Sequence, residues 1–374
     1  MVVPGQNHRD PWFADFFKAC LEDTKWLFQT EKGTPFLFPA TGTAGWEASL
    51  CNTLSPGDKV VTFRYGQFSH LWVDMMQRLG LDVHVEEERW GDGADEAKLE
   101  AILRADVGKE IKAVCVVQNE TTTGVTSDIA AVRRAMDAAG HPALLMVDGV
   151  SGIGALPFKF DDWGVDLAVT GSQKALSLPT GLACVAASPK ALKAMESAKL
   201  NRVFLDFGDM IKTNASGSVP YTPALGLLHG FRESVRLLRS EGIENVWARH
   251  HRLGTGARLA VKAWGLKLLC ENERWASDAL TVIETPAGVD SGLVIKNAFA
   301  KYNLSLGLGL SQVQGKVFRI GHLGNMDEIM LLSALAGTEM ALLDAGVKIT
   351  PGSGVGAALA HFQKTKGIYP TREF

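Results

Sequence analysis

Three features of this chain combine residue types that could do chemistry together. Lys174 lies in VTGSQKALSLPTGLA, where small residues, hydroxyls and a proline surround it between two apolar runs. Asp148 directly follows the apolar run ALLMV, and the tight turn TGTAG opens an amphipathic segment over residues 44–53. A lysine is costly to bury unless a charge pairs with it or its amine is bonded to a ligand. The surroundings of Lys174 therefore call for such a partner.

Each feature has an ordinary explanation when it is taken alone. A lysine is usually on the surface, a strand-end aspartate often caps a turn, and a glycine turn is a common helix entry. Together they supply an amine for a covalent bond to an aldehyde, a carboxylate for a protonated ring nitrogen and a helix N-terminus for a phosphate. These are the needs of pyridoxal phosphate, which we predict as the cofactor. We expect no metal.

The arrangement of apolar runs predicts the fold that positions these residues. The runs are apolar almost throughout, as expected for strands that are buried on both faces. Helical segments alternate with them, which is typical of an α/β fold with a mostly parallel sheet between layers of helices. Ligands bind such sheets beyond the carboxyl ends of the strands. The predicted strands are 59–63, 82–86, 111–117, 143–148, 165–170 and 182–187.

The rest of the chain predicts a second, smaller domain. We expect strands in LTVIETP and KVFRIG and a last helix from Met326 to Ala345 with Asn325 as its N-cap. Further helices are predicted over 12–29, 224–240 and 243–263. The predicted division is an N-terminal arm over 1–20, a large α/β domain over 21–240 and a small α+β domain over 241–374.

Composition narrows the function classes. The chain has 374 residues, of which 46% are hydrophobic and 21% charged, as in ordinary globular proteins. A net charge of −3 gives no reason to expect a nucleic acid or an anionic membrane as a partner. The apolar runs are too short to span a bilayer. The five cysteines lack CxxC spacing, and their odd number favours free thiols in a reducing compartment.

Several motifs, spread over nearly the whole chain, resemble the class V (fold type I) pyridoxal-phosphate aminotransferases. They include GTPFLFPATGTAGWEASL, NETTTGV, LLMVDGVSGIGALPF, GVDLAVTGSQKALSLPTGL, YTPALGLLHGFRES and GKVFRIGHLGN. Within this family they are similar to the serine–glyoxylate and alanine–glyoxylate enzymes. The resemblance implies a fold type I transferase with a seven-stranded type of sheet, acting as a homodimer on small amino acids and 2-oxo acids.

The resemblance also assigns roles around the cofactor. Lys174 would form the Schiff base and, once released, move the substrate proton, for which its pKa must fall. Asp148 would pair with the ring nitrogen. Phe68 would stack on the ring, where the family often has tryptophan, and Val150 would pack on the opposite face. Thr121 would bond the ring's phenolic oxygen.

The family pattern places further residues at the phosphate and the substrate. Arg319, in KVFRIGHLG, would grip the substrate carboxylate with paired hydrogen bonds. Arg9, preceded by His8, matches a pair that the family places near the neighbouring active site, so Arg9 is expected to contact the substrate there. The family has a further segment before this start, so the arm is expected to be truncated, unless this protein does without that segment. The expected phosphate ligands are Thr41, Gly42, Thr43, Gln173 and, from the neighbouring subunit, Thr222.

The implied reaction is transfer of an amino group from L-serine, or L-alanine, to glyoxylate in photorespiratory or glyoxylate metabolism. The donor stays open among serine, alanine and asparagine. The resemblance implies a peroxisomal location, with the mitochondrion as the alternative, because the chain ends in Arg-Glu-Phe rather than a Ser-Lys-Leu-like tripeptide.

Other functions stay open from the residues alone. A cysteine desulfurase needs a mobile nucleophilic cysteine and usually a histidine before the lysine, whereas Gln173 stands there. A nicotinamide-dependent oxidoreductase would need a GxGxxG turn, which KVVTFRYGQFSH lacks. A non-catalytic binding protein on the same fold would have no need of Lys174.

Overall fold

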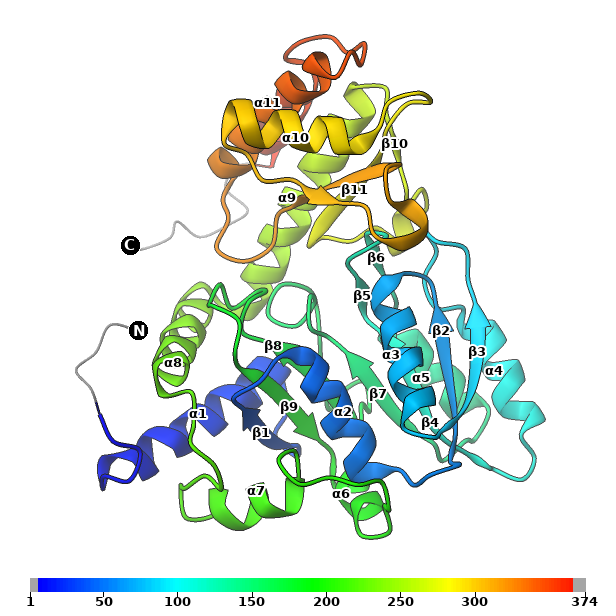
Figure 1. The fold of residues 1–374 in the computed structure, drawn as a ribbon, viewed down its shortest axis with the longest axis vertical. Coiled ribbons are helices and arrows are strands. Elements are labelled where there is room, and N and C mark those ends of the chain that lie inside the picture. The colour runs from blue at the N-terminus through cyan, green and yellow to red at the C-terminus, as the bar shows by residue number, and fades with distance from the viewer. Residues whose placement is uncertain (1–5, 366–374) are drawn as a thin grey trace.

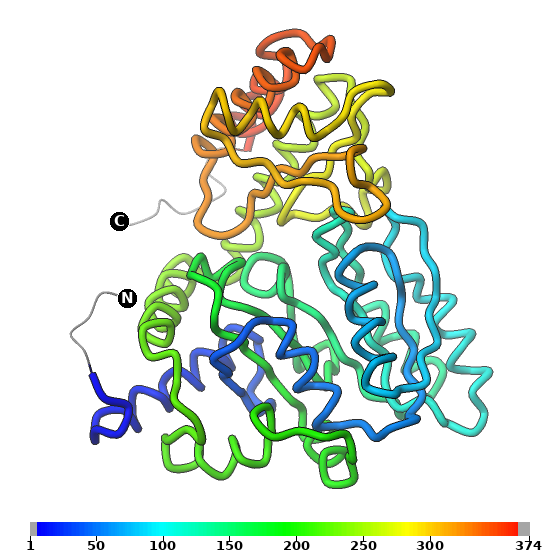
Figure 2. Tube along the Cα trace, viewed as in Figure 1, coloured from blue at the N-terminus to red at the C-terminus, as the bar shows by residue number. Residues whose placement is uncertain are grey.

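The computed structural model describes residues 6–365, which form a large lower part and a smaller upper part in Figure 1. The main hydrophobic core draws on residues from Phe13 to Val246, together with Cys270. A separate core lies between Leu253 and Phe362. Figure 2 shows the chain passing from the first part to the second through the segment after residue 240. The division at 20/21 and 240/241 stays a prediction, and Phe13 and Phe17 of the predicted arm pack in the main core.

A seven-stranded sheet forms the centre of the large part. Five neighbouring strands, β8, β7, β4, β2 and β3, run parallel to one another. Strand β9 is antiparallel to both of its neighbours, β8 and β1. The α/β fold class and all six predicted strands are confirmed. The strands, in sheet order, are β1 (Thr34–Phe38), β9 (Ala183–Ala187), β8 (Leu167–Gly171), β7 (Leu144–Asp148), β4 (Ile111–Val117), β2 (Lys59–Arg64) and β3 (Asp82–Glu87).

Strand β1 was absent from the sequence prediction, which took residues 59–63 as the first strand. Its sequence, TPFLF, contains Pro35, which has no backbone N–H to donate to a neighbour. Proline is tolerated at a sheet edge, and β1 occupies the edge beside β9. Position in the sheet therefore decides that this short run becomes a strand.

Helices cover both faces of the sheet, with α2 and α3 in front of it in Figure 1. Helix α2 packs on β8 and β9, α3 packs on β2 and β3, and α1 packs on β1 and α8. A small hairpin, β5 (Asn119–Glu120) and β6 (Val125–Thr126), follows β4. The helices are α1 (Trp12–Phe28), α2 (Gly42–Thr53), α3 (Gln67–Arg78), α4 (Glu96–Ala105), α5 (Ile129–Ala138), α6 (Pro189–Met195), α7 (Phe207–Asn214) and α8 (Leu225–Glu241).

The small part packs helices on an antiparallel four-stranded sheet of order β10-β11-β13-β12. Short 3-10 helices lie at Glu273–Trp275 and Ser311–Val313. The remaining elements are α9 (Ile243–Ala263), β10 (Lys267–Leu268), β11 (Leu280–Glu284), α10 (Ser291–Tyr302), β12 (Gly307–Leu308), β13 (Val317–Gly321), α11 (Glu328–Asp344) and α12 (Ser353–Lys364).

Two predictions at the end of the chain were wrong. The N-cap of α11 is Asp327, whose carboxylate accepts the N–H of Met330 at 2.8 Å, and not Asn325. The helix predicted from Met326 to Ala345 is also not the last, because α12 follows it. The glycine-rich start of α12 has low intrinsic helix propensity. A tertiary contact compensates, because the carboxylate of Glu339 accepts the N–H groups of Gly352 and Gly354. Sequence pattern alone does not contain that contact.

No helix within residues 6–365 combines the length and the apolar character needed to cross a bilayer.

Candidate active site

A cavity opens where the parallel strands β4, β7 and β8 end and the helices α2 and α3 begin. It has about 510 Å³ of space not filled by protein atoms, part of it open to solvent. Parallel strands end at the same edge of a sheet, so residues that follow different strands converge here. The lining residues are Thr41, Gly42, Thr43, Trp46, Phe68, Asn119, Thr121, Asp148, Val150, Ser151, Gln173 and Lys174.

Asp148 is the last residue of β7 and lies opposite Val117 and Val169 of the neighbouring strands. One carboxylate oxygen accepts the N–H of Val150 at 2.8 Å. Asp148 forms no ion pair with any residue in the described range 6–365. Burial raises its pKa to about 7. A cationic group in the cavity would favour its ionised form.

Lys174 lies just beyond β8 and lines the same cavity. Burial lowers the pKa of its amine, the positive charge of Arg319 acts in the same direction, and the charge of Asp148 opposes them. A lowered pKa increases the neutral fraction of an amine, and only the neutral amine can attack a carbonyl or accept a proton. The site therefore favours a reactive Lys174.

The start of α2 forms one end of the cavity. Thr41 occupies the N-cap position, so the first amides of the helix have no partner within it. A Cβ at Gly42 would lie 2.4 Å from Cγ2 of Val150, so only glycine fits at this contact. Gln173 Oε1 is buried without a hydrogen-bond partner among the described residues. The unpaired amides at the start of α2 suit an anionic group, whereas the Gln173 oxygen can only accept a hydrogen bond.

Side chains on two other elements frame the middle of the cavity. Phe68 belongs to the first turn of α3, and Val150 follows Asp148. The hydroxyl of Thr121 donates to Ser151 Oγ at 2.9 Å, which leaves its own oxygen lone pairs as acceptors. An apolar ring, an aliphatic side chain and a hydroxyl thus border the same space.

Arg319 reaches this region from β13 of the small part. Its Nη1 donates to the carbonyl oxygen of Thr121 at 2.8 Å, while its Nε is buried without a partner among residues 6–365. Burial lowers the pKa of Arg319, and the charge of Glu120 opposes this. Gly307 lies opposite Arg319 in the β12–β13 pair, and a Cβ there would lie 3.0 Å from Nε. Arg319 is thus adjacent to the cavity through Thr121, although it does not line it.

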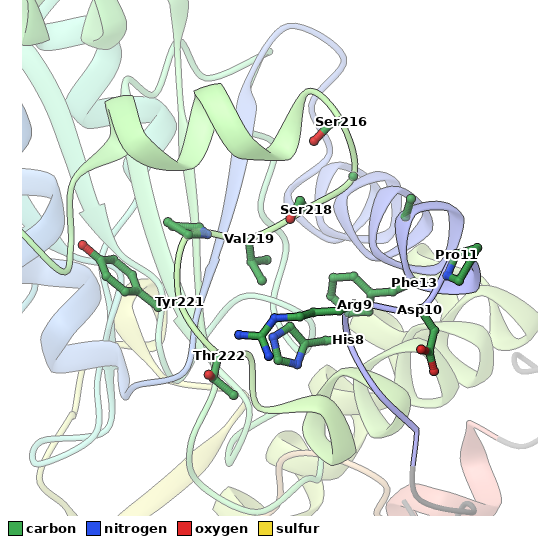
Figure 3. Close-up of a pocket in the computed structure, with 13 residues that line it drawn as sticks. His8, Arg9, Asp10, Pro11, Phe13, Ser216, Ser218, Val219, Tyr221 and Thr222 are labelled. Carbon is green, nitrogen blue, oxygen red and sulfur yellow. The ribbon is translucent and has the colours of Figure 1, made fainter.

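His8, Arg9 and Thr222 lie elsewhere in the chain. Figure 3 shows them in a pocket between the start of α1 and the segment 216–222. This pocket shares no lining residue with the Lys174 cavity. Within one chain these residues do not contribute to that cavity, and their action in a neighbouring subunit stays a prediction.

The sequence reasoning did not name Trp46, Asn119 or Ser151, which also line the cavity. Asn119 donates to Ser151 Oγ at 2.9 Å, and its own side-chain oxygen accepts from Ser277 Oγ at 2.6 Å. The available signal was position, because Asn119 follows closely on the predicted strand 111–117 and Ser151 follows closely on Asp148. Trp46 is one helical turn after Gly42.

These residues fit a flat heteroaromatic aldehyde that carries a phosphate. Arg319 Nε has no partner among the described residues, Gly42 leaves room at the start of α2, and no ion pair within residues 6–365 includes Asp148. Lys174 supplies an amine at the same cavity. The fold and the cavity together define the class of pyridoxal-phosphate transferases built on a mostly parallel sheet.

The chain belongs to the aminotransferase class-V family, whose model matches residues 4–281. It is 57% identical to the serine–glyoxylate aminotransferase of Methylorubrum extorquens, over 97% of this chain and 92% of that protein. It is 52% identical to the L-aspartate–glyoxylate aminotransferase of Paracoccus denitrificans, over 97% and 92%. The crystal structure of ureidoglycine–glyoxylate aminotransferase from Bacillus subtilis superposes with a TM-score of 0.89 at 28% identity, over 97% of this chain and 93% of that one.

Proposed function

We propose that this protein uses pyridoxal phosphate to transfer the amino group of L-serine, and also of L-alanine, to glyoxylate. The products are glycine and hydroxypyruvate or pyruvate. The observation that carries the proposal is the convergence of Lys174 and Asp148 on one cavity at the ends of adjacent parallel strands. The glyoxylate-using relatives support the choice of acceptor.

The residues that would hold the cofactor surround the cavity. Lys174 would bind it covalently, and Asp148 would face a protonated ring nitrogen. Phe68 and Val150 would border the ring and Thr121 its oxygen substituent, while Thr41, Gly42, Thr43 and Gln173 would hold the phosphate at the start of α2. When bound, pyridoxal phosphate carries the amino group between the substrates and withdraws electrons from the substrate Cα.

The protein's own groups supply proton transfer and orientation. The Nζ of Lys174, whose pKa burial lowers, accepts the proton from Cα of the amino donor and later returns one to Cα of the glycine formed. Arg319 binds the substrate carboxylate through its guanidinium, whose Nε has no partner among residues 6–365. Such anchoring fixes the direction of the Cα–H bond toward the lysine.

The choice of L-serine rests on relatives, since the protein from Paracoccus denitrificans is named for L-aspartate. Paired assays with glyoxylate and L-serine, L-alanine, L-asparagine or L-aspartate test it. We expect L-serine to have the highest kcat/KM and L-alanine to be used as well. Higher kcat/KM with L-aspartate would reassign the donor while leaving the transaminase intact.

Assembly, pathway and location are further parts of the proposal. We infer a homodimer, a role in photorespiratory or glyoxylate metabolism and a peroxisomal location from family resemblance. The final Arg-Glu-Phe lies outside the described residues. Sedimentation of the purified full chain tests the dimer, and a single monomeric species at micromolar concentration would contradict it.

The chemistry of the cysteines argues against a desulfurase. All five cysteines are buried, and none lines the Lys174 cavity. Burial raises the pKa of Cys20 to about 12 and of Cys270 to about 11, so these thiols carry little thiolate near neutral pH. The cavity therefore lacks the nucleophile that desulfuration requires.

A further inference from the structure

Glu120 is a fully buried carboxylate that the proposed reaction does not use. One of its oxygens accepts the N–H of Ser69 at 2.9 Å, and the other accepts the N–H of Thr122 at 3.0 Å. Ser69 lies in the first turn of α3, where N–H groups lack partners within the helix. Glu120 therefore caps α3 from a different element, the β5 strand.

The neighbours of these hydrogen-bonded residues line the cavity. Asn119 and Thr121 flank Glu120 in the chain, and Phe68 precedes Ser69. A second contact joins the same segments, because the N–H of Gln67 donates to Thr122 Oγ1 at 3.3 Å. The Glu120 carboxylate thus connects the segment of Phe68, proposed to stack on the cofactor ring, with that of Thr121, proposed to bond the ring's oxygen.

Gly66 makes room for this connection. A Cβ at Gly66 would lie 2.2 Å from the carboxyl carbon of Glu120, a distance that would force the carboxylate or the helix to move. The backbone of Gly66 is extended, with φ of 179°, so its conformation does not require glycine. The close approach of Glu120 does.

No ion pair among residues 6–365 includes Glu120, although its charge interacts with that of Arg319. Burial raises its pKa, and the backbone amides of Ser69, Thr122 and Phe68 oppose that rise. Backbone N–H groups, together with the hydroxyls of Ser69 and Thr122, thus stabilise Glu120 as an anion. A neutral side chain of the same shape would satisfy them less well.

The small part of the structure contains another buried carboxylate that caps a helix, that of Glu339, whose position in the sequence is far from the residues of the Lys174 cavity. Glu339 is also buried, and it accepts the N–H groups of Gly352, Gly354 and Val355 at the start of α12. A glycine is packed closely there too, because a Cβ at Gly354 would lie 2.2 Å from Trp264 Nε1. Both carboxylates accept N–H groups at the start of a helix, but Glu339 also accepts from Trp264 Nε1 at 2.8 Å, and hydrogen bonds lower its pKa whereas burial raises that of Glu120. No residue next to Glu339 in the chain lines the Lys174 cavity.

We propose that Glu120 is a positioning residue whose carboxylate, by joining the start of α3 to the NETTTG loop, holds Phe68 and Thr121 in the arrangement that binds pyridoxal phosphate tightly. This inference rests on the proposed function. It separates two roles that buried caps can have: Glu339 stabilises the fold alone, whereas Glu120 stabilises the fold and also sets cofactor affinity.

The test is titration of pyridoxal phosphate into the full-length apoprotein, followed by quenching of tryptophan fluorescence, for wild type, Glu120→Gln and Glu339→Gln. Melting temperatures of the three apoproteins are measured alongside. Both substitutions replace an acceptor oxygen with an amide that faces N–H donors, so both should lower Tm. Only Glu120→Gln should raise the Kd for pyridoxal phosphate, by about two- to thirtyfold, as for residues that act through their neighbours.

Each outcome has a distinct meaning. An unchanged Kd in Glu120→Gln overturns the inference while leaving the proposed function intact. An equal rise of Kd in both variants also overturns the inference, because the weaker binding would then follow from a general loss of stability. If the wild type itself binds no pyridoxal phosphate, the proposed function fails. Should Glu120→Gln not fold, Gly66→Ala with Gly354→Ala as its control makes the same comparison, with a raised Kd expected in Gly66→Ala alone.

Discussion

The Lys174 cavity and the pocket that holds His8, Arg9 and Thr222 gather functional candidates in different ways. Residues of the cavity follow strands or begin helices of one sheet, so the topology of a single chain brings them together. The other pocket joins the start of α1 to the segment 216–222, away from the strand ends (Figure 3). The proposed homodimer would let residues of the second pocket act on the cavity of a neighbouring subunit.

The largest expected effect of a substitution is the loss of turnover at Lys174, whose cavity is formed by residues of a single chain. Lys174→Ala should reduce turnover of L-serine and glyoxylate by at least about 10²–10⁴-fold, because the proton acceptor is lost along with the covalent anchor. Steady-state assays with saturating pyridoxal phosphate measure this. Lys190→Ala, which removes a lysine that is bonded to Asp166 outside the cavity, is the control. Retention of wild-type turnover by Lys174→Ala would contradict the role proposed for Lys174.

The next effect is a pH dependence of stability from Asp148. Its pKa in the folded apoprotein is raised from 3.8 to about 7, so the folded state keeps a proton that the unfolded state releases between these values. The contribution of Asp148 to the free energy of unfolding therefore falls as pH rises from about 4 to 7, and is constant above. Relative to Asp148→Asn, the wild type should lose on the order of 4 kcal/mol over this range.

Urea unfolding of both apoproteins at several pH values measures the difference. Adding pyridoxal phosphate to the wild type should remove most of the loss, because a cation would then face the ionised carboxylate. Parallel stability curves for wild type and Asp148→Asn would contradict the assignment of Asp148.

A smaller effect is expected for Arg319, which lies beside the cavity. Arg319→Gln should lower kcat/KM for L-serine by roughly 10- to 100-fold, the value of a lost hydrogen-bonded charge pair. Binding of pyridoxal phosphate itself should change little. Lys316→Gln, at an exposed position just before the same strand, is the control. A loss of cofactor affinity equal to the loss of kcat/KM would show that Arg319 serves the fold of the cavity instead.

The smallest effect is expected at Thr222, in the pocket that also holds His8 and Arg9. Thr222→Val should weaken pyridoxal phosphate binding by about tenfold or less, since a single hydroxyl to a charged acceptor is lost. The effect should be present in the dimer and absent when the protein is diluted to monomers. Kd measured across protein concentration tests this, and an effect independent of concentration would remove the reason to assign Thr222 to a neighbouring subunit.

The sequence predicted the residues whose positions follow from strand ends. Asp148 and Lys174 each follow an apolar run, and parallel strands must bring such positions together. The edge strand containing Pro35 and the glycine-rich start of α12 were not predicted, because sheet position and Glu339 decide them. Glu120 was missed for the same reason, since its role depends on contact with Ser69 and on the space left at Gly66, which are distant in the chain.

Borohydride reduction of the protein with pyridoxal phosphate, followed by peptide mass spectrometry, tests the central claim most directly. We expect one pyridoxyl group per chain, on Lys174, and little labelling of Asp148→Asn at limiting cofactor. A pyridoxyl group on another lysine, or none on Lys174, would contradict it.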